Sequence, residues 1–305
     1  MTEISRISTL SIHTTAIDNF NKVQTDLARL QDQISSGLQG RSFEDYNGQV
    51  EHLTALEAQV NRTDRFLQTN AEAELRLRTI EDALEEVMLL SDEVKTLFTA
   101  RNNPTFEDNI AFEVQLGNLR LSAAKGLNTS LEGRYLFGGT RTDQPPVIEE
   151  PVVPESVTPG VPDNIYYQGS EENVHIRIDD GIEKEYDIRA DDKAFQQFFA
   201  AMSLALEGHR QNDQILLDNA QNMLDDAQAG IIALTASVRS DIVDINRVVT
   251  RQNDTKLYLS GVLQEVARVD QVEAASRVAI DEATLTATFQ VFARVSALRL
   301  SDFLN

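Results

Sequence analysis

The two ends of the chain carry apolar stripes with helical spacing and little other apolar surface to cover them. The N-terminal stripe alternates steps of three and four residues and consists of Phe20, Val23, Leu27, Leu30 and Ile34. The C-terminal stripe lies among Thr, Ser, Arg and Asp residues and consists of Phe289, Phe292, Val295, Leu298 and Phe303. An isolated amphipathic helix is marginal in water unless its apolar face meets a partner. We therefore expect the two ends to pair with each other, and with copies from other subunits, as a coiled coil.

Periodicity alone also allows a second arrangement, in which the two ends are separate surface helices of a larger bundle. The other faces of the end helices favour assembly, because they carry small and hydroxylated residues that let subunits approach without fixed charge repulsion. These residues are Ser8, Thr9, Ser11, Thr14, Thr15, Thr284, Thr286, Thr288 and Ser296. The ten stripe residues are therefore candidate subunit contacts.

The composition excludes several classes of function. The 305 residues include no Cys, which removes disulfides, thiolate metal sites and Cys nucleophiles. A net charge of −22 argues against nucleic acid as a partner, and equally against docking on anionic membranes. No apolar run is long enough to span a bilayer, and the N-terminal sequence lacks the basic and apolar blocks of a secretory signal peptide. We expect a cytoplasmic protein, or one exported without a cleaved leader.

Helical periodicity continues inward from both ends. Helices are expected over residues 4–37, 50–101, 106–131 and 194–207, and a last helical run extends from Asp213 towards the C-terminus. Gly37 follows the last periodic residue of the first helix, and Pro104 cannot continue the second one. Within the second helix, the polar residues Asn70 and Glu74 occupy stripe positions.

The middle of the chain changes character. Residues 147–162 are rich in Pro and acidic residues and have no period, which is typical of an extended linker. Val174, Ile176 and Ile178 then alternate with polar residues, the pattern of a half-buried strand. Asp180–Gly181 predicts a hairpin turn, and residues 183–188 return as the partner strand. Since a lone hairpin is unstable, a small β domain that includes residues 165–168 is expected.

These patterns predict a mainly α protein. Its paired N- and C-terminal regions form a long antiparallel helical bundle or coiled coil, and a small β insert lies in the middle. We expect a terminal coiled-coil assembly domain of residues 1–38 plus 268–305, a helical bundle domain of residues 39–144 plus 191–267, and a small outer β domain of residues 145–190.

No combination of side chains in the sequence indicates catalysis. The four His residues lie far apart and no HExxH motif occurs, so the usual zinc ligands are missing. Asp179–Glu183 resembles part of a calcium loop but lacks its ligand spacing, and a hairpin turn explains the segment better. Gly138-Gly139-Thr140 lacks the lysine of a phosphate loop and is interpreted as loop closure. We expect no metal, no cofactor and no enzymatic activity.

Three segments resemble the bacterial flagellin family. Leu30–Leu38 reads LQDQISSGL and looks like a signature near the start of flagellins, and Leu285–Ser296 is similar to their C-terminal helix. Gly133–Pro146 resembles a segment typical of the hook-associated branch of this family, which joins hook to filament. Its central residues are Tyr135, Leu136, Phe137, Gly138, Gly139 and Thr140. The loop Phe43–Gly48 departs from the family pattern, in which an Asp-Asp-rich step follows the first helix.

The resemblance implies a structural subunit of the flagellum that is needed for filament attachment and motility. Such proteins leave the cell through the flagellar type III export channel with an uncleaved N-terminal signal. They assemble with copies of themselves as a ring or helical oligomer, between a preceding hook-associated junction protein and flagellin. An export chaperone binds the C-terminal part beforehand. Two alternatives stay open: a short filament flagellin, and an intracellular helical scaffold or binding protein.

Overall fold

The structure is a computed structural model, and it describes residues 2–40, 46, 48, 50–101, 109–150, 157–162, 164–185 and 188–301. The side chains of residues 2–13, 16, 109, 110, 292 and 295–301 lie outside this description. Contacts divide the chain into two units. Unit 1 comprises Met1–Arg62 and Lys256–Asn305, and unit 2 comprises Thr63–Thr255. The three-domain division expected from the sequence stays a prediction.

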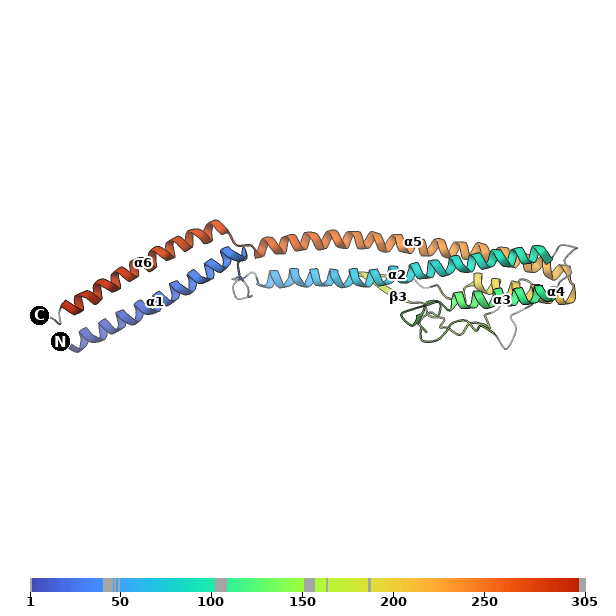
Figure 1. Cartoon of the computed structure of the whole chain (residues 1–305), viewed down its shortest axis with the longest axis horizontal. Helices are drawn as coiled ribbons and strands as arrows, with labels where there is room; N and C mark the ends of the chain where they lie inside the picture. The colour runs from blue at the N-terminus through green and yellow to red at the C-terminus, as the bar shows by residue number, and fades with distance from the viewer. Residues whose placement is uncertain are drawn as a thin grey trace. The chain divides into compact units, whose positions relative to one another are not determined.

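The chain is mainly α-helical with a small β insert in the middle, as the sequence predicts (Figure 1). The helices of the described part are α1 (Thr2–Ser36), α2 (Val50–Arg101), α3 (Asn109–Leu127), α4 (Lys193–Gln211), α5 (Gln214–Ala267) and α6 (Gln271–Ser301). Its strands are β1 (Ser130–Leu131), β2 (Arg134–Tyr135), β3 (His175–Asp179) and β4 (Ile182–Glu185). Helices α2 and α5 contribute residues to both units.

In unit 1, α1 and α6 lie side by side along much of their length (Figure 1). The Phe20 ring meets the Phe289 ring, and further along α1 a β-bridge joins Leu38 to Arg268. Residue numbers fall on the α6 side as they rise on the α1 side, so the pairing is antiparallel. The expectation that the two ends pair with each other is confirmed.

Both helical runs of unit 1 are interrupted beside this bridge. Gly37 has a φ of 72° and ends α1, and its N–H donates to the Gln33 carbonyl at 2.8 Å. The Asp270 carboxylate accepts hydrogen bonds from the first N–H groups of α6, with distances of 2.9 and 3.1 Å. The helical run expected from Asp213 towards the C-terminus is therefore broken at residues 268–270, where a new helix begins.

The core of unit 2 is built from stripes of four helices. Fully buried side chains include Leu77, Leu84 and Val87 of α2, Phe112 of α3, Phe195, Phe198 and Phe199 of α4, and Leu224 and Ile231 of α5. Because apolar burial contributes about 25 cal/mol per Å², these aromatic and aliphatic side chains dominate the stability of the unit. The helical spacing in the sequence correctly places the α2, α4 and α5 residues of this set on apolar stripes, and it missed Phe112 of α3.

Two helix ends differ from the expected ones by four residues each. Helix α3 ends at Leu127 and not at residue 131, because Ser130–Leu131 pairs with Arg134–Tyr135 as a small hairpin. Helix α4 continues past residue 207 to Gln211, where Asn212 takes a left-handed cap conformation with a φ of 52°.

The predicted hairpin at Asp180–Gly181 is confirmed as the antiparallel pair β3–β4, with a register shift between Arg177 and Asp179. It is fastened to α2 and α5 by buried amides. The side chains of Asn70 and Gln252 each donate a hydrogen bond of 2.9 Å to the Ile178 carbonyl, and they bond to each other at 3.0 Å. A polar residue at a stripe position of α2 thus binds the backbone of the insert.

Candidate assembly surface

The α1 stripe lies on the side of α1 that meets α6. Leu30 is 5% exposed, and the other four members are half-buried: Phe20, Val23, Leu27 and Ile34. The chain therefore covers much of this stripe by itself. These residues hold unit 1 together, and any role of theirs in subunit contacts stays a prediction.

The C-terminal stripe is described only in part. Phe289 packs edge to face on Phe20, with ring centroids 5.1 Å apart, but 55% of its surface is still exposed. The side chains of Phe292, Val295 and Leu298 lie outside the described residues, as does Phe303.

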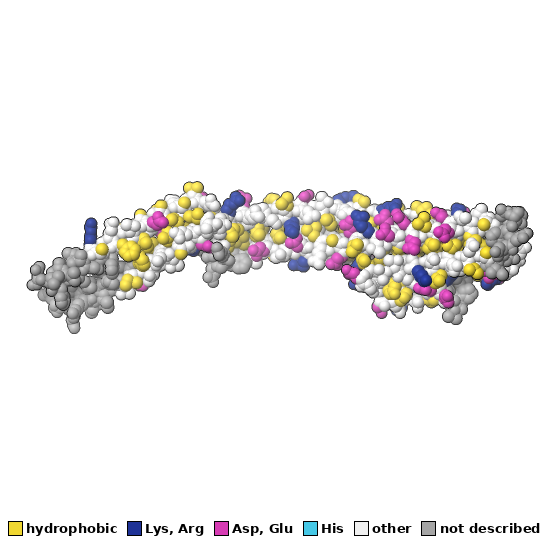
Figure 2. Space-filling model, in the orientation of Figure 1, with side chains coloured by type: hydrophobic (Ala, Val, Ile, Leu, Met, Phe, Trp, Pro, Cys, Tyr) yellow, Lys and Arg dark blue, Asp and Glu magenta, His cyan; other side chains and the backbone are white. Residues whose placement is uncertain are grey.

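A second apolar stripe on α6 faces away from α1 and was missed by the sequence reasoning. Ile280 and Val291 are each 61% exposed, and Ala283 and Ala287 between them are exposed as well. Steps of three and four residues place these four side chains on one side of the helix, which we name the α6 outer face. Ala274, by contrast, is buried in unit 1. Figure 2 shows apolar side chains at the surface of the α1–α6 pair.

None of the four residues of the α6 outer face is charged, and Asp281 and Glu282 lie on other sides of the helix. The hydroxyls of Thr284 and Thr288 nearby donate to carbonyls of their own helix at 2.8 Å. They therefore present small, internally satisfied surfaces and leave no polar group in need of an outside partner. Because α6 has apolar surface on two sides, it can pack against α1 and against a further helix.

The sequence signal for this face was the 3-4-4 spacing of Ile280, Ala283, Ala287 and Val291. Alanine at two of the four positions weakens that signal, because Ala occurs equally on buried and exposed helix faces. The large residues Phe289, Phe292 and Val295 form a stronger stripe nearby.

The motif Tyr135–Thr140 connects segments of unit 2 that are far apart in the sequence. The Phe137 side chain is fully buried and meets the Phe195 ring of α4 edge to face, with centroids 6.3 Å apart. Its carbonyl accepts a hydrogen bond from the Ala190 N–H, and the Gly138 carbonyl accepts one from the Ser170 N–H, each at 2.9 Å. The motif thus joins the segment after α3 to the segment before α4.

The backbone conformation and the close neighbours at position 139 require glycine. Its φ of 62° is left-handed, and a Cβ atom there would lie 2.6 Å from the carbonyl oxygens of Ser170 and Glu172. The Thr140 N–H in turn donates to the Glu172 carbonyl at 3.1 Å. The motif closes a loop, as expected, and its residues contact the chain itself.

Ionic contacts hold the β3–β4 hairpin to α5 beside the Asn70–Gln252 pair. Lys184 lies 2.8 Å from Asp241 and 2.7 Å from Asp244, and Arg251 lies 2.6 Å from Asp179. Partial burial disfavours the charged form of Lys184, but hydrogen bonds to the two carboxylates outweigh it and raise its pKa. The hydrogen bond from Lys184 lowers the pKa of Asp244.

Among the described residues, no group of three or more His, Asp or Glu side chains could hold a metal ion. None of the described helices is long and apolar enough to cross a membrane.

No protein-family model matches the sequence, and no curated protein does. Solved structures match the fold. A protein described as a flagellar hook-associated protein from Vibrio parahaemolyticus superposes with a TM-score of 0.60 at 17% identity, covering 71% of this chain and 96% of that one. FlgL of Bacillus cereus superposes with a TM-score of 0.55 at 20% identity, covering 68% of this chain and 97% of that one. The chain therefore has the fold of these two proteins over nearly their whole length.

Proposed function

We propose that this chain is a non-enzymatic structural subunit of the bacterial flagellum that joins hook to filament. The observation that carries the proposal is the α6 outer face. Helix α6 uses one side to pack against α1 and leaves a second apolar, uncharged side exposed. A face of this kind is suited to packing against neighbouring subunits in an ordered array.

The energetics favour repeated contacts between copies. Complete burial of an Ile or Val side chain stabilises by about 1.5–3 kcal/mol, and Ile280 and Val291 are both more than half exposed in the single chain. A few such side chains per subunit give a weak contact between two copies. Summed around a ring or along a tube, where each subunit has several neighbours, the same contacts give a stable assembly.

The fold and the sequence motifs support the flagellar setting. The two similar structures are a flagellar hook-associated protein and FlgL. The segment Tyr135–Thr140 resembles the hook-associated branch of the flagellin family, and its residues form a closed loop in unit 2. On this proposal the partners are other copies, a preceding hook-associated protein and flagellin. An export chaperone covers the C-terminal part before secretion, and the mature protein is extracellular.

Immunogold electron microscopy of intact flagella tests the proposal. An epitope is inserted at the exposed β3–β4 turn, between Asp180 and Gly181, outside the helices of both units. We expect gold only between hook and filament, and we expect deletion of the gene to release unattached flagellin into the medium. Gold along the whole filament would identify a short filament flagellin. Protein that stays inside cells with an intact export apparatus would identify an intracellular scaffold.

A further inference from the structure

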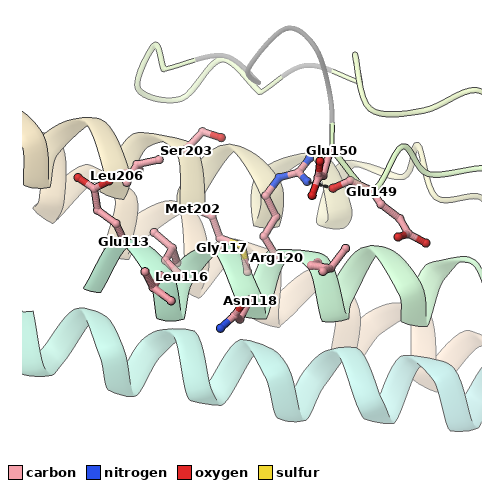
Figure 3. A pocket seen from close by; sticks show the side chains of 12 residues that line it. Glu113, Leu116, Gly117, Asn118, Arg120, Glu149, Glu150, Met202, Ser203 and Leu206 are labelled. Atoms are coloured by element: carbon pink, nitrogen blue, oxygen red, sulfur yellow. Dashed lines mark hydrogen bonds between the residues drawn. The ribbon is translucent and has the colours of Figure 1, made fainter. Parts of the chain in front are cut away.

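A groove of about 480 Å³ lies between α3 and α4 in unit 2 (Figure 3). Its floor contains Leu116 and Met202, which are 3% and 1% exposed. Val114 of α3 is 56% exposed along one wall, and Leu206 of α4 is half-buried along the other. The groove is therefore an apolar trough that opens to solvent.

Gly117 lies in this groove and has no explanation within the fold. A Cβ atom at Gly117 would meet nothing within 4 Å, and the residue has no positive φ. Glycine inside a helix is destabilising relative to alanine. Gly126 on the same helix differs, because a Cβ there would lie 3.4 Å from the Val87 side chain of α2. The missing side chain at Gly117 leaves room for a molecule outside the chain to approach the α3 backbone closely.

The charge around the groove selects the kind of molecule. Glu149 and Glu150 carry exposed side chains at one edge. The Arg120 guanidinium lies at the same edge, where it donates to the Glu149 carbonyl at 2.6 Å and lies 5.2 Å from the centre of the Phe199 ring (Figure 3). Two exposed carboxylates and one guanidinium, which already contacts the chain, leave this edge with a net negative charge.

With a net charge of −22, other copies of this chain suit this acidic edge less well than they suit the uncharged α6 outer face. A segment with an apolar side chain and nearby basic residues matches both properties of the site. Its apolar side chain covers Val114 and Leu206 beside Gly117, and its Lys or Arg residues lie against Glu149 and Glu150.

We propose that the α3–α4 groove docks a basic, amphipathic segment of a different protein. The inference does not depend on the assembly role of α6, because the groove belongs to unit 2 and uses other residues. It assigns this chain a second interaction surface, of opposite chemistry to the uncharged α6 outer face.

Isothermal titration of the full-length protein tests the proposal. The probe is a synthetic amphipathic peptide of Leu and Lys with about four helical turns. A scrambled peptide of the same composition serves as the control for charge alone. Gly117→Trp fills the groove where the structure has open space, and Gly117→Ala is its matched control. Glu149→Gln/Glu150→Gln neutralises the edge, and Glu86→Gln/Glu93→Gln removes the same charge from exposed positions on α2.

We expect Gly117→Trp to weaken binding about tenfold or more and the Glu149/Glu150 variant about fivefold, while both controls stay within about twofold of the wild type. Circular dichroism of each variant confirms that the helices are intact. Equal binding by wild type and Gly117→Trp would overturn the proposal, as would equal binding of the scrambled peptide or no binding at all. A dimer that forms without peptide and is lost in Gly117→Trp would also overturn it, by making a second copy the occupant.

Discussion

The Phe20 ring of α1 meets the Phe289 ring of α6 edge to face, with ring centroids 5.1 Å apart. The two residues lie near opposite ends of the sequence, yet they belong to one antiparallel pair of helices in unit 1. Phe20 is half-buried, and Phe289 remains 55% exposed. The pairing of the chain ends therefore covers only part of the apolar surface of α6, and the α6 outer face is available to neighbours.

Removal of the Phe20 ring is expected to loosen unit 1 alone. An edge-to-face aromatic pair contributes about 0.5–1.5 kcal/mol beyond its buried area. Phe20→Ala should therefore speed amide hydrogen exchange in α1 and α6 by about tenfold, with little change in the α2 core of unit 2. Thr25→Ala is the control, because this exposed hydroxyl bonds only to the Asn21 carbonyl of its own helix. Unchanged exchange in α6 of the Phe20→Ala variant would contradict the pairing.

Two Gly→Ala substitutions are expected to act in opposite directions. Gly139→Ala places a methyl group 2.6 Å from two carbonyl oxygens at a left-handed φ, and should destabilise unit 2 by at least about 1–3 kcal/mol. Gly117→Ala adds a methyl group in open space on α3 and should stabilise it by up to about 1 kcal/mol. Urea unfolding measures both. A stable Gly139→Ala protein would show that the motif loop tolerates a side chain.

Loss of a buried amide that fastens the hairpin is expected to destabilise unit 2. Asn70 is fully buried, and its side-chain nitrogen serves both the Ile178 carbonyl and Gln252. Asn70→Leu leaves those two partners with fewer hydrogen bonds in a dry site and should cost about 1–3 kcal/mol. Thr96→Ala, at an exposed position of the same helix, should be close to neutral. Urea midpoints that match for the two variants would contradict this role.

The hairpin contacts also predict a pH dependence. The folded-state pKa of Asp244 lies below its ordinary value because of Lys184, so the contact adds stability above the unfolded pKa of about 4 and loses it as pH falls through the folded value. The raised pKa of Lys184 adds stability below about pH 10 and loses it as pH rises through the folded value. Between about pH 7 and pH 3, wild type should therefore lose more stability than Lys184→Met. Equal losses in urea unfolding would refute the contribution.

Much of the fold could be predicted because its cause is local. Leu77 and Leu84 of α2 and Leu224 of α5 belong to apolar stripes whose period follows from helix geometry alone. Asp180–Gly181 favours a hairpin turn by its own backbone preferences. The pairing of the two ends was also predictable, since neither end had another apolar surface to cover its stripe.

The remaining features depend on partners far away in sequence. Asn70 gave only the signal of a polar residue in an apolar stripe, and nothing in the sequence linked it to Ile178 or Gln252. The break at residues 268–270 was missed because Asp270 is a helix cap only once a preceding helix has ended. The α6 outer face was not predicted, because two of its four residues are alanines and the neighbouring stripe has larger apolar residues.

Incorporation of α6 variants into flagella tests the central claim most directly. Ile280→Asp places a carboxylate on the α6 outer face and leaves the contact with α1 intact. Leu89→Asp makes the same change at a residue of α2 that is 65% exposed. Quantitative blots of purified flagella should show Ile280→Asp exported into the medium but absent from flagella, and Leu89→Asp incorporated like the wild type. Wild-type incorporation of Ile280→Asp would contradict the role of this face in assembly.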